Sequence, residues 1–501
     1  MSYKWAVLLC LMPGIMVFLI DVTVVNVALA TLGAVFSVRV DTVQWVITAF
    51  SLASGIATPM ASFIEGRFTM RRVWIAGLVT FTSASALCGL APAFWVLVVG
   101  RIFQGMAGGL MLPLAISTLF RAFPPGERGM ALGFFAIPLV AGPALGPTIG
   151  GYIVTNLDWR YVFFINVPIG ILAVLLAVFL LHGGERRHGE RFDVVGAIFS
   201  TLGFGSSLYG LSRVDHDGWG SIAVLGFVGF GLLNLLAFFI YEAEREQPLL
   251  DVRLFLIPRF FFANLVGWVS TIALFGAEFM LPLYLQQVRG LSAFDTGLLL
   301  LPQGLSVAVA GPLAGRLVDW IGARLVVMGG FALLAFNTWE MSHITINTTY
   351  DTLRVLVAVR GLALGAALQP TQLVALGVVP EAFRTAASSL NNAMRSIFQS
   401  FGIAMLSTVV QTQTQVHSAL LGWQVGPATL ARAAADLRAH GVAASLAPLQ
   451  VLEALLKQAA VLAFGDAYRI TFFAALAAIA VAVLLPGRGE ITVEPMAALG
   501  E

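Results

Sequence analysis

Two acidic residues stand inside long apolar stretches of the sequence. Asp21 lies between Trp5 and Leu32, and Glu278 lies between residues 260 and 286. A carboxylate within the hydrocarbon of a membrane persists where it binds protons or cations in a wet cavity, so both residues are candidates for proton coupling. A proton and a cationic substrate would compete for such a group. The alternatives are that Asp21 only accepts hydrogen bonds from neighbouring helices, and that Glu278 stays hydrated near the outer surface.

Arg101 is a third candidate for proton coupling. Gly105 and Gly108 follow it at one and two helical turns, a spacing that lets the backbone of a neighbouring helix approach closely. A buried guanidinium near a carboxylate favours the deprotonated carboxylate. The alternative is that Arg101 reaches out to the membrane interface.

A run of glycines and prolines forms a second kind of candidate site. Gly142, Gly146 and Gly150 recur every four residues, and Pro143 and Pro147 interrupt the same stretch. The glycines form a smooth stripe, and the prolines remove backbone hydrogen bonds and bend the helix. We expect this stripe to seal the closed interface between two helix bundles, with plain helix packing as the alternative.

Other polar and aromatic residues within apolar stretches could line a substrate cavity, although hydrogen bonding between helices explains the polar ones equally well. The candidates are Asn26, Phe275, Phe279, Gln369, Asn392 and Arg395. The histidines show no metal-ligand spacing, and no phosphate-binding loop precedes a helix. We therefore expect no enzymatic activity, no metal, no cofactor and no ATP-driven pumping.

Composition indicates where these residues must lie. Of the 501 residues, 59% are hydrophobic and 11% are charged, whereas about a quarter of the residues of soluble domains are charged. A bilayer crossing takes about 20 helical residues, so the chain is predicted to be an all-α polytopic membrane protein. The net charge of +2 provides no field for nucleic acid, and Cys10 and Cys88 lie in apolar runs that imply no disulfide framework.

Breaks at Gly, Pro and charged clusters predict fourteen spans. They lie near residues 5–31, 42–64, 73–91, 94–120, 129–153, 161–181, 193–212, 220–241, 260–286, 294–317, 323–343, 353–378, 388–411 and 467–485. Most of the 28 Lys and Arg residues fall on one side of these spans. The positive-inside rule then predicts that both termini are cytoplasmic.

The order of six, two and six spans predicts a duplicated bundle with an insertion. The expected units are a six-helix bundle over 1–181, two extra helices within 182–258, a second bundle over 259–486 that includes an extracytoplasmic segment 412–466, and a cytoplasmic tail over 487–501. Short basic loops after spans two and ten support the repeat and are candidate gating loops; their residues are Arg67, Arg71, Arg72, Gly315, Arg316, Asp319, Gly322 and Arg324. Two such bundles would rock about a central site, as in alternating-access transporters.

Several motifs on these spans resemble the 14-helix drug:proton antiporters of the major facilitator superfamily, of the EmrB/QacA type. They are residues 21–29 (DVTVVNVAL), 101–109 (RIFQGMAGG), 142–151 (GPALGPTIGG), 159–160 (WR), 164–170 (FINVPIG) and 281–286 (LPLYLQ). The resemblance implies a major facilitator fold in a bacterial cytoplasmic membrane and a role of Arg101 in proton transfer. It also implies proton-coupled efflux of lipophilic, often cationic compounds. The alternative within this fold is proton-driven export of a particular lipid, fatty acid or metabolite.

Some positions depart from the family pattern. Ala30 replaces a usual proline, and Ser62, Gly66 and Thr69 replace a glycine, an aspartate and a glycine of the loop after span two, so that the acid has either moved to Glu65 or been lost. The size and position of segment 412–466 resemble EmrB. They imply contact with a membrane-fusion protein and an outer-membrane channel, and a solvated cap without a partner is the alternative.

Overall fold

The computed structural model describes residues 2–183, 192–439 and 446–487, and within these ranges it contains helices and no β-strand. The first long helices are α1 (Tyr3–Val35), α3 (Trp45–Ala57), α4 (Ala61–Phe68), α5 (Met70–Gly89), α6 (Phe94–Ala122), α7 (Arg128–Asn156) and α9 (Asn166–Leu180). The chain continues with α10 (Val194–Ser212), α12 (Ile222–Ala243), α13 (Pro258–Leu283), α14 (Ala293–Ile321), α15 (Ala323–Met341), α16 (Tyr350–Gly377), α17 (Arg384–Ala439) and α18 (Ala447–Ala482). A 3-10 turn (Thr58–Met60) joins α3 to α4, and the short helix α8 (Tyr161–Phe164) leads into α9.

Ten helical segments of the described chain are long and apolar enough to cross a membrane. Helices α7, α13, α15 and α16 are also long and pack among them, but they are not in that set. The expected all-α polytopic membrane protein is confirmed, and the count of fourteen spans stays a prediction.

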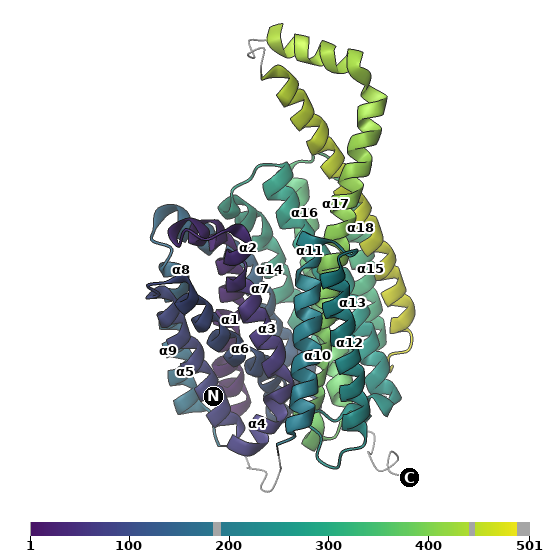
Figure 1. Ribbon diagram of the computed structural model, residues 1–501. Helices are drawn as coiled ribbons and strands as arrows, with labels where there is room; N and C mark the ends of the chain where they lie inside the picture. Colours follow the sequence, from purple (N-terminus) through teal and green to yellow (C-terminus); the bar gives the residue numbers. More distant parts are fainter. Residues whose placement is uncertain (1, 184–191, 440–445, 488–501) are drawn as a thin grey trace.

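The helices stand side by side, with α1 to α9 on one side of the molecule and α13 to α18 on the other (Figure 1). Helix α7 packs along α14, and α6 packs against α17. Helix α10 contacts α3 from the first group and α17 from the second, and α12 packs on α10. Helices α10 and α12 therefore cover one seam between the groups.

The contact between α7 and α14 brings two backbones together. A Cβ atom built on Gly129 would overlap the carbonyl group of Gly315, and one built on Gly133 would overlap the backbone of Gly311. Only glycine allows this approach, because any side chain would push the helices apart.

Thr69 and Gly322 end α4 and α14 with the same unusual backbone conformation. Their φ angles are 77° and 89°, a region that glycine enters freely and that a β-branched residue rarely adopts. The two connections are thus alike in geometry, and the first carries threonine where glycine would be unstrained.

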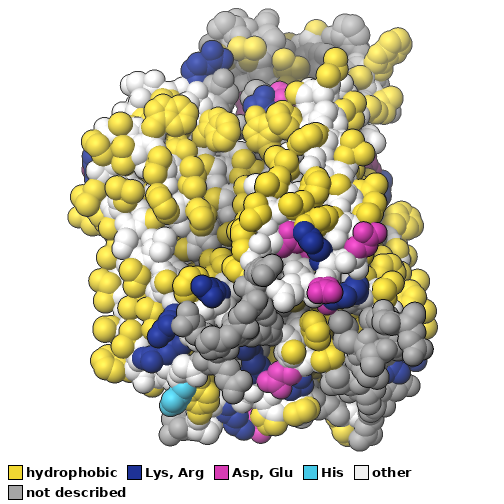
Figure 2. Space-filling view, turned by 60° about the horizontal axis from the view of Figure 1, so that its bottom comes forward, with side chains coloured by type: hydrophobic (Ala, Val, Ile, Leu, Met, Phe, Trp, Pro, Cys, Tyr) yellow, Lys and Arg dark blue, Asp and Glu magenta, His cyan; other side chains and the backbone are white. Residues whose placement is uncertain are grey.

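Helices α17 and α18 extend beyond the bundle as a hairpin, at the end opposite to the start of α1 and the end of α18 (Figure 1). The segment 412–466 belongs largely to this hairpin, and residues 449–464 lie in the first half of α18. Figure 2 brings the other end of the molecule forward and shows Lys and Arg side chains gathered there.

Candidate functional site

The first cluster of functional side chains is closed inside the bundle around Asp21. Asp21 on α1 is fully buried and forms an ion pair with Arg101 on α6, which is 1% exposed. Its other carboxylate oxygen, Oδ1, accepts a hydrogen bond from Asn166 Nδ2 at 2.7 Å and one from Gln104 Nε2 at 3.2 Å. Donors from α6 and α9 thus compensate a charge that would otherwise be costly to bury.

Arg101 is held from several sides as well. Its Nε donates to the carbonyl oxygen of Val46 on α3 at 3.0 Å, and its Nη1 donates to Gln104 Oε1 at 3.0 Å. Its guanidinium lies 4.0 Å from the ring centroid of Phe50, a cation–π contact. The alternative that Arg101 reaches the interface is wrong, because its side chain points into the helix bundle.

Sequence reasoning missed three members of this cluster. Gln104 both accepts from Arg101 and donates to Asp21, and it also donates to Ser85 Oγ at 2.6 Å. Its position three residues after Arg101 places it on the same helical face, which was a usable signal. Asn166 lies in the motif 164–170, which was noted for its resemblance and not as a site, and Ser85 carried no signal beyond its polarity in an apolar stretch.

A second acid–arginine cluster surrounds Glu278 on α13. Gln303 on α14 donates from Nε2 to both carboxylate oxygens, at 2.8 and 3.0 Å, and Arg360 on α16 donates to Oε2 at 3.2 Å. Arg360 is 1% exposed, whereas the Glu278 side chain is 30% exposed. Neither Arg360 nor Gln303 was recognised as a partner from the sequence.

The two clusters occupy equivalent positions in the chain. Asp21 lies on the first long helix and Arg101 on the fourth, when α3 and α4 are counted as one. Counted from α13, Glu278 again lies on the first helix and Arg360 on the fourth. The internal repeat could therefore have identified Arg360. The side chains of Phe275 and Phe279, expected to line a substrate cavity, lie outside the described part of the structure.

The glycine stripe of α7 does not lie where the sequence analysis expected it. A Cβ atom on Gly142 would meet Leu19, one on Gly146 would meet Thr23, and one on Gly150 would meet Val24. All three partners belong to α1, so the stripe packs α7 against another helix of the first group. The three glycines of the stripe therefore do not form the contact with the second group. Gly129 and Gly133 meet α14, and so does Thr148 of the same run, which a Cβ atom on Gly297 would overlap. Pro147 lies within the same helix, and the side chain of Pro143 is outside the described part.

Glu65 does find a cationic partner. It is 7% exposed and forms an ion pair with Arg121 near the end of α6. Arg121 also donates to Thr385 Oγ1, in the first turn of α17, at 3.0 Å. The three side chains thus connect the first group of helices to the second at the end where α1 begins.

The basic residues of the candidate gating loops have other contacts. Arg71 donates to the carbonyl oxygen of Val178 near the end of α9, and Arg324 donates to that of Leu485 just after α18, both at 2.7 Å. Each lies two residues after a positive-φ residue, and each satisfies a carbonyl group near a helix C-terminus. Arg67, Arg72 and Arg316 are exposed, Gly315 and Gly322 have the backbone roles described above, and the side chain of Asp319 lies outside the described part.

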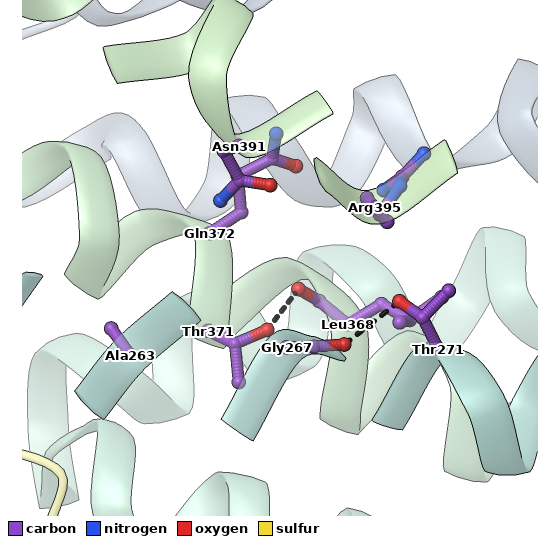
Figure 3. Close-up of a pocket in the computed structure, with 8 residues that line it drawn as sticks. All are labelled: Ala263, Gly267, Thr271, Leu368, Thr371, Gln372, Asn391 and Arg395. Carbon is purple, nitrogen blue, oxygen red and sulfur yellow. Dashed lines mark hydrogen bonds between the residues drawn. The ribbon is translucent and has the colours of Figure 1, made fainter. Parts of the chain in front are cut away.

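Arg395 lines a pocket between α13, α16 and α17 (Figure 3). The other lining residues are Ala263, Gly267, Thr271, Leu368, Thr371, Gln372 and Asn391. Of the cavity candidates, Gln369 and Asn392 are buried elsewhere and Asn26 is exposed.

Comparison with known proteins agrees with this architecture. Residues 11–403 match the Major Facilitator Superfamily. The lincomycin resistance protein LmrB of Listeria innocua is 31% identical over 395 residues, which cover 79% of this chain and 84% of LmrB. A multidrug resistance protein B homolog of Mycobacterium tuberculosis is 30% identical over 417 residues, which cover 82% of this chain and 77% of that protein.

A solved structure shows the same fold. The proton:xylose symporter XylE superposes with a TM-score of 0.61, at 16% identity, over 100% of this chain and 99% of XylE. The resemblance expected from the motifs is confirmed: the chain belongs to the Major Facilitator Superfamily, a family of membrane transporters rather than enzymes.

Proposed function

We propose that this transporter exports lipophilic compounds, many of them cationic, in exchange for protons, by alternating access. Relatives named for lincomycin resistance and multidrug resistance support efflux of drugs. The observation that carries proton coupling is the fully buried Asp21–Arg101 pair. A carboxyl group in this position can bind a proton only by giving up its ion pair, so protonation and helix packing are linked.

The expected sequence of events follows from that link. When Asp21 binds a proton, Arg101 loses its charged partner and keeps its contacts to Val46, Gln104 and Phe50. The attraction between α1 and α6 weakens, which favours a different packing of these helices. Release of the proton restores the ion pair and the original packing. A cationic substrate would favour the deprotonated state and so compete with the proton.

Glu278 is proposed as a second coupling acid. Its partner Arg360 occupies the position equivalent to Arg101, and the Glu278 side chain is 30% exposed, which leaves room for a proton or a cation to approach it. Glu278→Gln should weaken the transport of cationic compounds more than that of neutral ones, because it removes one negative charge from the cavity. An equal loss for both classes would point to proton coupling alone, and no loss would exclude a part in transport.

The moving units in this proposal are a bundle over 1–181 and a bundle over 259–486, with the two extra helices of 182–258 beside them. The close approaches of Gly129 to Gly315 and of Gly133 to Gly311 would then hold the two bundles together on the side of the membrane where α1 begins. On the same side, Arg121 connects Glu65 to Thr385. The basic end of the molecule in Figure 2 supports a cytoplasmic location of this side, with both termini there, in a bacterial cytoplasmic membrane.

The hairpin of α17 and α18 would then lie outside the cytoplasmic membrane. Its exposed apolar residues include Trp423, which is 89% exposed, and Leu449, which is 59% exposed. These surfaces support the expected contact with a membrane-fusion protein where the source has an outer membrane.

The test is transport in proteoliposomes with an imposed pH gradient, with a fluorescent lipophilic cation as substrate. The wild-type protein should accumulate the cation against its gradient. Asp21→Asn keeps the side-chain shape and removes the titration, so it should abolish gradient-driven accumulation and retain counterflow between labelled and unlabelled substrate. Retained counterflow proves that the variant is folded, and unchanged accumulation at every pH would exclude Asp21 as a coupling acid.

One observation favours the second candidate function, export of a particular lipid, fatty acid or metabolite. Arg395 is the one lining residue of its pocket with a formal charge, and a guanidinium suits the anionic head group of a lipid or fatty acid better than a cation.

A further inference from the structure

The pocket between α13, α16 and α17 has an unusual balance of polar groups. Of its eight lining residues, Arg395 is the one with a formal charge. The acids proposed to attract cations lie elsewhere: Glu278 is seven residues after Thr271, about 10 Å along α13, and it is bound by Arg360 and Gln303. The one formal charge among the lining residues is therefore a cation.

Two hydroxyl groups and one amide of the pocket differ in how their hydrogen-bond donors are used. The Thr371 hydroxyl donates to the carbonyl oxygen of Leu368 at 2.7 Å, and the Thr271 hydroxyl donates to that of Gly267 at 2.8 Å (Figure 3). These hydroxyl hydrogens are turned back to their own helices. Gln372 is 7% exposed, and its Nε2 has no hydrogen-bond partner. A buried amide without a partner is costly, and such groups await an acceptor.

The space beside these donors suits a small group. The cavity has a volume of about 20 Å³, which holds about one water molecule. On the α13 side, a Cβ atom on Gly267 would meet no atom within 4 Å, so the space beside this glycine is open. Ala263 and Leu368 add an apolar edge. One oxygen of a head group fits among the donors, and an apolar body would follow the wall next to Gly267.

We infer that this pocket binds a negatively charged oxygen group, a carboxylate or a phosphate, at the head of a lipophilic substrate. Arg395 supplies the charge and Gln372 the free amide donor, a combination that strengthens hydrogen bonds to an anion and repels an ammonium group. The inference rests on the proposed export of lipophilic compounds, and it adds an anionic substrate class to the cationic one that Asp21 and Glu278 would attract.

The experiment measures binding to the purified transporter in detergent, without a proton gradient. Four probes share a dansyl-labelled undecyl chain and differ in the head group, which is a carboxylate, a phosphate, a methyl ester or a trimethylammonium. At least one anionic probe should bind about tenfold more tightly than the ester and the trimethylammonium probe, which corresponds to about 1.4 kcal/mol. A preference for the carboxylate indicates a free acid, and a preference for the phosphate indicates a lipid-like head group.

Variants of the lining residues test whether the preference for anionic head groups arises in this pocket. Arg395→Gln should lower the affinity for the preferred anionic probe about tenfold, to that for the ester probe. The affinity for the ester probe itself should not change. Gln372→Leu should lower it several-fold. Gly267→Leu fills the open space and should weaken the binding of all probes, whereas Gly226→Leu, at another open glycine on α12, should weaken none.

Two results would overturn the inference. One is equal affinity of the wild-type protein for anions and the ester, and the other is an anion preference that Arg395→Gln leaves unchanged. If Arg395→Gln does not fold, Arg395→Lys keeps the charge and loses the planar fork, so the anion preference should shrink without disappearing. Because binding is measured without a gradient, failure of proton-driven transport would refute the proposed function and leave the anion preference standing.

Discussion

Breaking the Asp21–Arg101 pair should destabilise the protein by an amount that depends on which partner is removed. Asp21→Asn leaves a guanidinium that is 1% exposed without a charged partner. Removing one partner of a buried pair costs about 3–5 kcal/mol. Arg101 keeps acceptors in Val46 and Gln104 and the ring of Phe50. We therefore expect the lower end, about 3 kcal/mol.

Arg101→Met should cost less than Asp21→Asn. A carboxyl group left alone can bind a proton and become neutral, whereas a guanidinium cannot lose its proton. Asp21 also keeps the hydrogen bonds that Asn166 and Gln104 donate to it. The double variant Asp21→Asn/Arg101→Met removes both charges, and it should be at least about 1 kcal/mol more stable than Asp21→Asn alone.

The assay is unfolding by denaturant in detergent micelles, followed by circular dichroism, for the wild type, both single variants and the double variant. A matched control is Asp351→Asn, which breaks the exposed pair of Asp351 and Arg354, whose side chains are 88% and 57% exposed. The control should change stability by less than about 1 kcal/mol. Additive effects of the two substitutions, or an Asp21→Asn variant as stable as the control, would refute the assignment of the pair as a buried ion pair.

Three further predictions follow from the backbone and the hairpin. Thr69→Gly should raise the midpoint of thermal unfolding, because it relieves about 1 kcal/mol of strain at a φ of 77°. Gly322→Ala should lower the midpoint, because alanine would be strained at a φ of 89°. An unchanged midpoint in both variants would show that these backbone conformations cause no strain. Gly311→Leu should abolish gradient-driven efflux with normal expression, because α14 could no longer approach Gly133, whereas Gly329→Leu, at an open position on α15, should transport normally. Normal efflux by Gly311→Leu would mean that this approach is not needed for transport. Trp423→Cys should react with an impermeant maleimide in intact cells, since Cys10 and Cys88 are buried and give no background; labelling only after permeabilisation would reverse the proposed orientation.

The sequence predicted most of the helices. The predicted span 94–120 is α6, Phe94–Ala122, and the predicted span 323–343 is α15, Ala323–Met341. These helix boundaries could be predicted because charged residues, glycines and prolines interrupt the apolar runs, and such breaks are visible in the local sequence. The hairpin was predicted less well. Helices α17 and α18 continue from their expected spans without interruption, since Ala-rich polar segments remain good helix formers outside the membrane.

The sequence alone determined that Asp21, Arg101 and Glu278 are charges inside apolar helices, because the cost of such charges can be read from neighbours along the chain. Only the tertiary structure decided their partners. It paired Asp21 with Arg101 and Glu278 with Arg360, and it turned the stripe of Gly142 towards α1. Which side chains pair depends on which helix faces meet. When a helix is apolar on all sides, its sequence does not show which face will pack against which neighbour.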